Sequence, residues 1–294
     1  MTVGRLKAVM LKRITYIGRN GMGKFDGILL VTDLDGTLLR SDKSVSEENR
    51  RAIEYFKSEG GLFAFVTGRV PPGGVPVYEM VAPNAPCGCS NGSCVYDYRT
   101  GELLWHRELP RSVLEIVADV DREFPTVGIE LCTFDKIYFC RKTESTERHR
   151  RNECFPDLTC HYREVQEPLG KILFAASDVA ELQRLTKRLQ AHPLAADFTM
   201  MRSDTEYYEI LPKNAGKGDL VLKLAEILKI PLHKIIAVGD NENDVTMLKA
   251  AGLGIAVANA YDVAKAAADY VTVSNEQHAI ARIIEELDNG TLAV

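Results

Sequence analysis

The sequence predicts an α/β fold, namely a doubly wound parallel sheet into which a separate α+β domain is inserted. Short apolar strands alternate with amphipathic helices in both end portions of the chain, as is typical of a parallel sheet with crossover helices. In the middle, charged patches and isolated strand-like stretches replace this alternation. We therefore expect a core made of residues 22–96 and 209–294, and an inserted domain made of residues 97–208.

The composition is that of an ordinary globular protein and argues against several partners. The 294 residues, 46% hydrophobic and 26% charged, suffice for one large or two modest domains. A net charge of −5 argues against nucleic acid, because binding to a phosphate backbone needs clustered Lys and Arg. No apolar run is long enough to span a bilayer, so we expect no membrane partner. The oligomeric state is not predicted.

The cysteines and the N-terminal region suggest where the protein works and where its fold begins. Seven cysteines, an odd number with no secretory signal before them, favour reduced thiols and a cytoplasmic location. The first 25 residues contain six basic residues and neither Asp nor Glu. Because Met22 lies just before the first apolar strand, we expect residues 1–21 to be an N-terminal extension outside the core fold.

The first apolar strand should cover residues 28–31 and end at a pair of acids, Asp33 and Asp35. An ordinary acidic turn is the alternative, because Asp and Gly are common turn residues. A capping box at 44–47, with Ser46 an equally good N-cap, should open the following helix.

The next elements complete a βαβ unit. Gly60 and Gly61 should end the helix, and residues 62–66 should form a second apolar strand that ends in Thr67-Gly68-Arg69. The sequence Pro-Pro-Gly-Gly at 71–74 should break any helix directly after it.

The remaining periodicities predict elements in both domains. In the later core they are helices at 218–229, 262–268 and 279–287 and strands at 235–238, 254–257 and 270–273. In the inserted domain they are helices at 112–124 and 179–190 and a strand at 136–140.

Four polar clusters follow apolar strands or open helices of the predicted core. They are Asp33/Asp35, Thr67/Gly68, Lys217/Gly218 and Asp240/Asn243/Asp244. Right-handed crossovers place all parallel strand ends on one side of a sheet, so the clusters should converge in one pocket. Together these residue types suit phosphoryl transfer. A carboxylate can act as the nucleophile, a second acid can move protons, and Mg²⁺, a Lys and hydroxyl groups can hold phosphate oxygens.

Six segments in order resemble the haloacid dehalogenase (HAD) superfamily and, within it, the Cof-like phosphatases with a large α/β (type C2) cap. They are Asp33-Leu-Asp-Gly-Thr-Leu-Leu39, Val66-Thr-Gly-Arg69, Ser90-Asn-Gly-Ser93, Lys217-Gly-Asp219, Gly239-Asp-Asn-Glu-Asn-Asp-Val-Thr-Met247 and Val257-Ala-Asn-Ala260. The resemblance covers the chain from about residue 27 to its end. It implies a Rossmann-like core, with the inserted domain as a cap that closes over the active site.

The resemblance also implies roles for matched residues. Asp33 would be the nucleophile and Asp35 the general acid/base. Mg²⁺ would be held by Asp33, Asp240 and the main-chain carbonyl of Asp35. The phosphoryl group would be bound by Leu34, Thr67, Gly68, Lys217 and Asn243. Supporting roles would fall to Asp244, which positions Lys217 or the metal's water shell, and to Arg69 and Asn91.

Each of these residues also has a plainer interpretation. Thr67 can be a turn hydroxyl, Lys217 a solvated charge, and Asp240 a helix N-cap. Asp244 can be structural, and Arg69 can reach the substrate or only brace the cap.

Two further groups of residues tempt a functional interpretation. Cys87, Cys89 and Cys94 are candidates for zinc, although their spacing is not that of a common structural site, and buried thiols are the alternative. The basic run Arg148–Arg151 is either a solvated face or a contact for an anionic part of the substrate.

The resemblance thus implies an Mg²⁺-dependent phosphomonoester hydrolase that acts on small phosphorylated metabolites through an aspartyl-phosphate. Sugar phosphates come first by resemblance, with nucleotides and pyridoxal phosphate behind. The alternatives are a phosphosugar mutase and a non-catalytic regulator that binds phosphorylated metabolites. Cap closure would exclude water, with residues 71–74 and 208–216 as candidate linkers.

Overall fold

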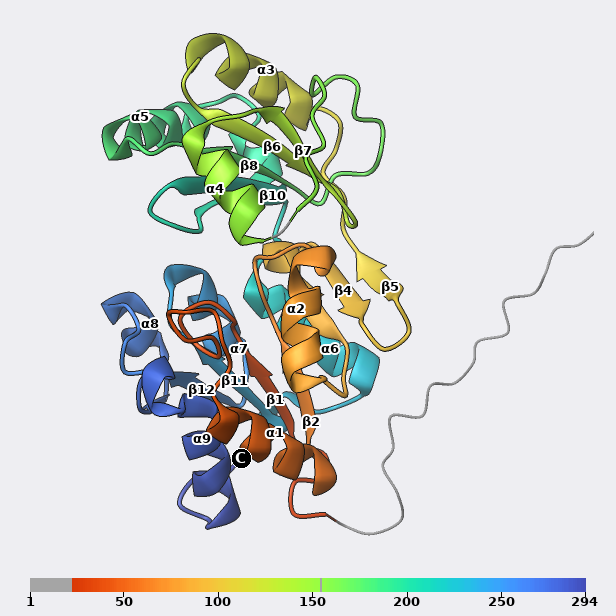
Figure 1. Ribbon diagram of the computed structural model, residues 1–294, viewed down its shortest axis with the longest axis vertical. Coiled ribbons are helices and arrows are strands. Elements are labelled where there is room, and N and C mark those ends of the chain that lie inside the picture. Colours follow the sequence, from red (N-terminus) through yellow and green to blue (C-terminus); the bar gives the residue numbers. More distant parts are fainter. Residues whose placement is uncertain (1–22, 154) are drawn as a thin grey trace, which may run out of the picture.

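The computed structural model describes residues 23–153 and 155–294, which form two bodies stacked one above the other (Figure 1). The expected extension at residues 1–21 lies outside the described residues. The strands are β1 (Leu29–Thr32), β2 (Leu62–Phe65), β3 (Cys87–Cys89), β4 (Cys94–Asp97), β5 (Glu102–His106), β6 (Gly128–Cys132), β7 (Ile137–Arg141), β8 (Lys171–Ala175), β9 (Phe198–Arg202), β10 (Tyr207–Pro212), β11 (Ile235–Gly239), β12 (Leu253–Ala256) and β13 (Tyr270–Val271). The helices are α1 (Glu47–Ser58), α2 (Pro71–Val81), α3 (Val113–Glu123), α4 (Glu144–Asn152), α5 (Val179–Gln190), α6 (Lys217–Leu228), α7 (Val245–Ala250), α8 (Asp262–Ala267) and α9 (Ala279–Asp288).

The lower body is the predicted α/β core. Its five strands are parallel and follow the order β13-β12-β11-β1-β2, so that Leu30 of β1 lies between Phe63 of β2 and Ile236 of β11. The strands are apolar on both faces because helices cover both: α1 packs with α9, and α6 packs with α7 (Figure 1). The predicted fold class is therefore confirmed. Ser46 caps α1, accepting a hydrogen bond from the backbone N–H of Asn49.

The upper body is an antiparallel sheet of order β7-β6-β8-β10-β9, with α3 and α5 on one face and α4 packed against β6 on the other. Side chains alternate across a strand, so each strand offers one set of residues to each face. Ile129, Ile172 and Ile210 pack under α3 and α5 in a second apolar core. Their neighbours Glu130, Lys171 and Glu209 are buried on the opposite face, which is turned toward the lower body. The cap therefore has one apolar face and one charged face.

The strand pairings bear on where the inserted domain begins and ends. Strand β5 pairs with β4, which pairs with β3 in a small sheet that packs on the lower core. Strand β10 pairs with β8 and β9 in the cap sheet as far as Pro212. These pairings favour boundaries near residues 107 and 212 over the expected 97 and 208. The division into domains stays a prediction.

One local expectation is wrong, because residues 71–74 open a helix. Helix α2 begins at Pro71, since the first turn of a helix needs no backbone N–H donors and proline presets the helical φ. Gly74 is required there for a different reason: a Cβ at this residue would lie 2.1 Å from the hydroxyl of Tyr98. These residues are a packed helix start and do not form a linker to the cap.

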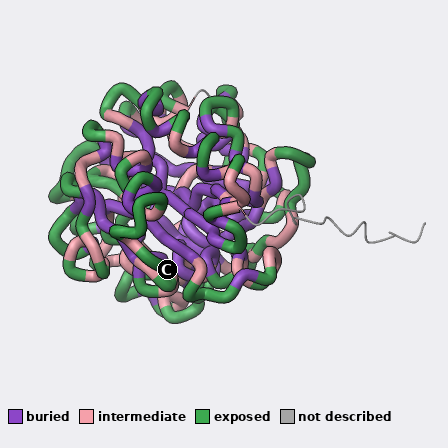
Figure 2. Tube along the Cα trace, turned by 90° about the horizontal axis from the view of Figure 1, so that it is seen from below, coloured by how far each residue is buried: buried purple, intermediate pink, exposed green. Residues whose placement is uncertain are grey.

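Burial follows this layering. The view along the core in Figure 2 shows buried strands at the centre and exposed segments around the rim. Among the described residues, no helix has both the length and the apolar character needed to cross a membrane.

A close approach of two turns positions the start of α6. Gly92 has φ +119°, and a Cβ there would lie 2.1 Å from the backbone nitrogen of Gly216, the residue before Lys217. No side chain fits between these two segments. The absence of a side chain at Gly92 therefore allows the turn at residues 90–92 to lie directly against Gly216, the residue before α6.

Gly92→Ala should lower the free energy of unfolding by more than about 3 kcal/mol, because it adds a steric clash to an unfavourable positive φ. Gly27→Ala is the matched control: Gly27 also has a positive φ (+77°), but a Cβ there would have no atom within 4 Å. It should cost only about 1 to 2 kcal/mol. Urea unfolding of both variants measures the difference, and equal losses would contradict the close-approach argument.

Candidate active site

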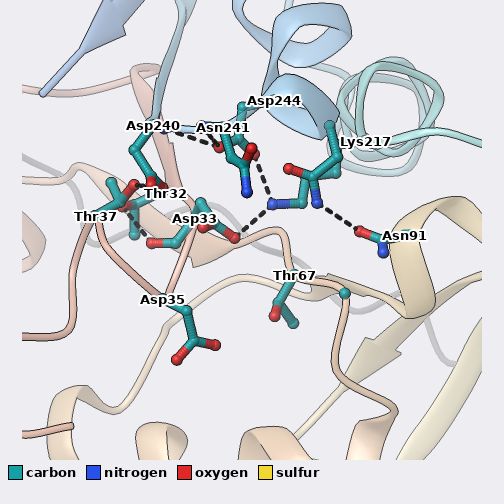
Figure 3. A network of polar contacts seen from close by, with 12 residues as sticks. Thr32, Asp33, Asp35, Thr37, Thr67, Asn91, Lys217, Asp240, Asn241 and Asp244 are labelled. Atoms are coloured by element: carbon teal, nitrogen blue, oxygen red, sulfur yellow. Dashed lines mark hydrogen bonds and ion pairs between the residues drawn. The ribbon is translucent and has the colours of Figure 1, made fainter. Parts of the chain in front are cut away.

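The four predicted polar clusters meet at the edge of the core sheet that faces the cap (Figure 3). Asp33 directly follows β1 and Asp240 directly follows β11, and these strands are neighbours. Lys217 is the first residue of α6, and Asp244 immediately precedes α7. Residues about 200 positions apart in the sequence thus share one site, as the strand-end argument predicts.

Lys217 lies between two carboxylates at the centre of this site. Its Nζ is 2.6 Å from Oδ1 of Asp33 and 2.6 Å from Oδ1 of Asp244. The side chain of Lys217 is 1% exposed, which excludes a solvated charge. Burial lowers the pKa of Lys217, but the two carboxylates outweigh burial and raise it above its ordinary value. The ammonium therefore stays charged and holds Asp33 in a fixed orientation.

Asp33 is under electrostatic strain. Burial raises the pKa of its carboxyl group well above the ordinary value, and the neighbouring charges of Asp244 and Asp240 raise it further, against the opposing effect of Lys217. One buried ammonium therefore faces three buried carboxylates. Such a site carries an excess of negative charge that a cation would relieve.

Asp240 is held by the loop that follows β1. Thr37 Oγ1 donates a hydrogen bond to Asp240 Oδ1 over 2.8 Å, and Gly36 (φ +84°) comes so close that a Cβ there would lie 2.6 Å from Oδ2. Burial, followed by the charge of Asp244, raises the pKa of Asp240 to about 6. Its side chain caps no helix, because that role falls to Asn241.

Asp244 organises the loop after β11. Its Oδ2 accepts hydrogen bonds from the backbone N–H groups of Asp240 and Asn241 over 2.8 and 2.9 Å, while Oδ1 accepts from Lys217. Both oxygens are therefore occupied by donors. This arrangement is compatible with both sequence-based interpretations of Asp244, as a structural residue and as the residue that positions Lys217.

A divalent metal fits this cluster. One carboxylate oxygen from each of Asp33, Asp240 and Asp244 can be chosen so that all lie within 4.8 Å of one another. Carboxylate oxygens are the ligands that Mg²⁺ prefers, and the repulsion among them gives a cation a favourable place. Because donors occupy both oxygens of Asp244, Asp33 and Asp240 are the better ligands. This is the set that the resemblance implies, apart from the carbonyl of Asp35.

The side chain of Asp35 points away from the acidic cluster (Figure 3). Arg69 donates to both of its oxygens, from Nε over 3.0 Å and from Nη2 over 2.9 Å, and Lys43 donates to Oδ1 over 2.7 Å. Burial acts to raise the pKa of Asp35, but Arg69 and Lys43 lower it to about 2. Arg69 also lies 3.3 Å from Glu153 at the end of α4, so it contacts the cap.

The loop after β2 contributes Thr67 and Gly68 to the same cavity as the acids. Thr67 Oγ1 accepts a hydrogen bond from the backbone N–H of Arg69 over 3.2 Å. A Cβ at Gly68 would lie 2.8 Å from Nδ2 of Asn91, so only glycine fits there. Asn243 donates from Nδ2 to Oδ1 of Asn91 over 3.2 Å. The predicted phosphate-binding residues are thus brought together.

Leu34, also predicted to bind phosphate, differs from the others. Its side chain is completely buried in the core. Only its main chain can reach a ligand.

Apart from the basic run Arg148–Arg151, the cap's half of the site was not predicted from the sequence. A cavity of about 480 Å³ lies between the two bodies, and its cap wall includes Arg148, His149, Glu153, Lys171, Tyr207 and Glu209. Arg148 pairs with Glu206 and lines this cavity, so the basic run is not simply a solvated face. The sequence did carry a usable signal for two of these residues. Lys171 and Glu209 each lie in an otherwise apolar strand, and the residues next to them along the strand face the apolar core.

The cysteine group does not form a metal site in the described part of the chain. Cys87, Cys89 and Cys94 are free, buried thiols in β3 and β4. Burial raises the pKa of Cys87 well above its usual range, which disfavours the thiolate that zinc needs. Within residues 23–153 and 155–294, the acidic cluster is the group with metal-binding geometry.

The raised pKa of Asp240 predicts a pH-dependent stability difference. A carboxyl with a folded-state pKa near 6 and an ordinary value of 3.8 destabilises the fold as pH rises through this interval. In EDTA, Asp240→Asn should therefore gain about 2 to 3 kcal/mol over the wild type between pH 4 and pH 7. Urea unfolding across this range measures the change. Parallel curves for the two proteins would contradict it.

Comparison with known proteins agrees with this geometry. The family model of haloacid dehalogenase-like hydrolases matches residues 30–284. "Putative phosphatase YxeH" from Bacillus subtilis is 31% identical over 267 residues, covering 88% of this chain and 97% of that protein. The "5-amino-6-(5-phospho-D-ribitylamino)uracil phosphatase YitU" of the same organism is 27% identical, covering 88% and 96%. The crystal structure of a haloacid dehalogenase-like hydrolase from Bacteroides thetaiotaomicron has a TM-score of 0.79 at 25% identity, covering 88% of this chain and 99% of that one. The resemblance found in the motifs is confirmed, and the chain belongs to the haloacid dehalogenase-like hydrolases.

Proposed function

We propose that this hydrolase is an Mg²⁺-dependent phosphatase of small phosphorylated metabolites, with Asp33 as the nucleophile. The observation that carries the proposal is the buried contact between Lys217 and Asp33. Lys217 contacts Oδ1 of Asp33 and, among the described residues, no hydrogen-bond donor contacts Oδ2. One oxygen is thus fixed while the carboxylate stays able to attack phosphorus from a defined direction.

Asp33, Asp240 and the main-chain carbonyl of Asp35 would hold the metal. When bound, Mg²⁺ would neutralise part of the phosphate charge, which otherwise repels the carboxylates. Lys217 supplies a second, permanent positive charge beside Asp33. Thr67, Gly68 and Asn243 surround the same space and would hold the phosphoryl oxygens through a hydroxyl, a backbone N–H and an amide.

In this proposal Asp35 carries out both proton transfers. With its pKa near 2, the carboxylate in the described arrangement is a proton acceptor at neutral pH. This state suits the second step, in which Asp35 takes a proton from the water that hydrolyses the aspartyl-phosphate. In the first step Asp35 must be protonated, so that it can donate a proton to the oxygen of the leaving group. It therefore requires that the contacts to Arg69 and Lys43 open when the substrate binds.

A polyhydroxylated leaving group, such as a sugar or polyol, fits the cavity best. Its wall is mostly polar, and two residues that line it, Glu153 and Asn243, each keep a buried side-chain oxygen with no hydrogen-bond partner among the described residues. Hydroxyl donors would satisfy such oxygens. The relative YitU is named for a phosphate on a ribityl group, which is also a polyol.

A cytoplasmic location stays a prediction from the sequence.

The proposal has two competitors, and one assay separates them. A phosphosugar mutase would use the same Asp33 but return the phosphoryl group to a hydroxyl, so it would form an isomer and release little phosphate. A non-catalytic regulator would bind phosphate esters without turnover. We therefore propose a panel of phosphate esters assayed with and without Mg²⁺, with free phosphate and isomers measured together. Mg²⁺-dependent phosphate release supports the phosphatase.

Asp33→Asn should reduce phosphate release at least about a thousandfold, because the amide removes the nucleophile. Circular dichroism and thermal unfolding check that the variant keeps its fold. The control is Asp178→Asn in the cap, where Asp178 is the N-cap of α5 and Asn caps equally well. Normal turnover by Asp33→Asn would exclude the proposed mechanism.

Sugar and polyol phosphates should be hydrolysed with a kcat/KM at least about tenfold higher than that for pyridoxal phosphate. The reason is that a planar aromatic leaving group leaves the polar wall unsatisfied, and unpaired buried polar groups are strongly unfavourable. Steady-state kinetics on matched esters test this. A preference for the aromatic ester would contradict the assignment of substrate class while leaving the phosphatase proposal intact.

A further inference from the structure

A buried ion pair on the cap reaches the core loop that is predicted to bind phosphate. Lys171 is the first residue of β8 and Glu209 lies in β10, the neighbouring strand. Their side chains are only 4% and 3% exposed, and Lys171 Nζ lies 3.0 Å from Glu209 Oε1. Lys171 Nζ also donates to the carbonyl oxygen of Gly68 over 2.9 Å. The charged face of the cap sheet thus contacts the core directly.

Lys171 fixes one peptide group of the loop after β2. The carbonyl of Gly68 accepts from Lys171, and the N–H of the same peptide group, which belongs to Arg69, donates to Thr67 Oγ1 over 3.2 Å. A trans peptide is planar, with its C=O and N–H on opposite sides, so holding the oxygen also aims the N–H at Thr67. Thr67 Oγ1 accepts this bond, which leaves its hydroxyl proton to donate to a bound phosphoryl oxygen.

Glu209 fixes two core amides. A carboxylate only accepts hydrogen bonds, so Glu209 Oε2 requires the nitrogen of Asn91, whose Nδ2 lies 3.0 Å away. The oxygen of Asn91 must then face Asn243, and it accepts from Nδ2 of that residue over 3.2 Å. The orientation of Asn243, a predicted phosphate contact, is therefore set by a cap carboxylate two hydrogen bonds away.

We propose that Lys171 and Glu209 are positioning residues through which the cap completes the phosphate-binding half of the core site. The inference rests on the proposed function. Both residues line the cavity, but their hydrogen bonds across the contact between cap and core go to core groups. Their loss should therefore affect every phosphate ester to the same extent, which distinguishes them from residues that select the substrate.

The test compares Lys171→Met, Glu209→Gln and the double variant Lys171→Met/Glu209→Gln with the wild type. Each single change leaves one buried charge without its partner and should lower the thermal midpoint, whereas the neutral double variant should recover most of that loss. The double variant should nevertheless lose at least about tenfold in kcat/KM for p-nitrophenyl phosphate and for a sugar phosphate, by the same factor. Its glutamine can donate or accept, so it no longer dictates the orientation of Asn91.

A second readout does not depend on turnover. Calorimetric titration with inorganic phosphate in the presence of Mg²⁺ should give a Kd at least about fivefold higher for the double variant. The matched control is Lys136→Met/Glu167→Gln, which neutralises a half-exposed pair of the cap outside the cavity lining. It should stay within twofold of the wild type in both assays.

Two results would overturn the inference: phosphate affinity and kcat/KM of the double variant within twofold of the wild type, or a loss confined to one leaving group. If the wild type hydrolyses no ester, the proposed function fails instead. In that case the calorimetric comparison alone decides whether the pair positions the phosphate site.

Discussion

The site depends on one buried ammonium, that of Lys217, held between Asp33 and Asp244. Three carboxylates gather at the edge of the sheet, and without Lys217 their mutual repulsion in a buried position would go largely uncompensated. Asp244 uses its other oxygen to hold two backbone N–H groups of the loop after β11. The two ion pairs of Lys217 thus orient Asp33, fix that loop and set the place of Asp240.

Parallel strand ends supply the framework on which this charge arrangement stands. Strands β1 and β11 are neighbours, so the residues that follow them, Asp33 and Asp240, approach each other. The approach is close enough to exclude side chains. A Cβ at Gly239 would lie 2.6 Å from Cβ of Asp244, and one at Gly36 would lie 2.6 Å from Asp240. Glycine at these positions of the motifs therefore allows the backbone to lie close to the acidic side chains.

The core and its family were predictable from sequence because their signals are local. In the core, Ser46 caps α1 as expected, and in the cap the helix at 179–190 has the bounds that its periodicity predicts. Other features depend on partners distant in sequence. Pro71 opens a helix where the sequence predicted a break. Against the effect of burial, the pKa of Asp35 is lowered by Arg69, whose side-chain direction no motif encodes. The roles assigned to the site residues stay predictions.

The cap illustrates why the substrate was the least predictable feature. In β8 and β10 alternate residues face opposite ways, so each strand contributes both to an apolar core and to the wall of the cavity. Lys171 and Glu209 are buried because the core covers that face, and their apolar strand context indicates the burial but not the partner. Buried charges persist only when paired, so the cap wall and the core loop must be complementary. The geometry of the predicted phosphate-binding loop therefore depends on how the two bodies meet, and sequence patterns within either one do not describe that contact.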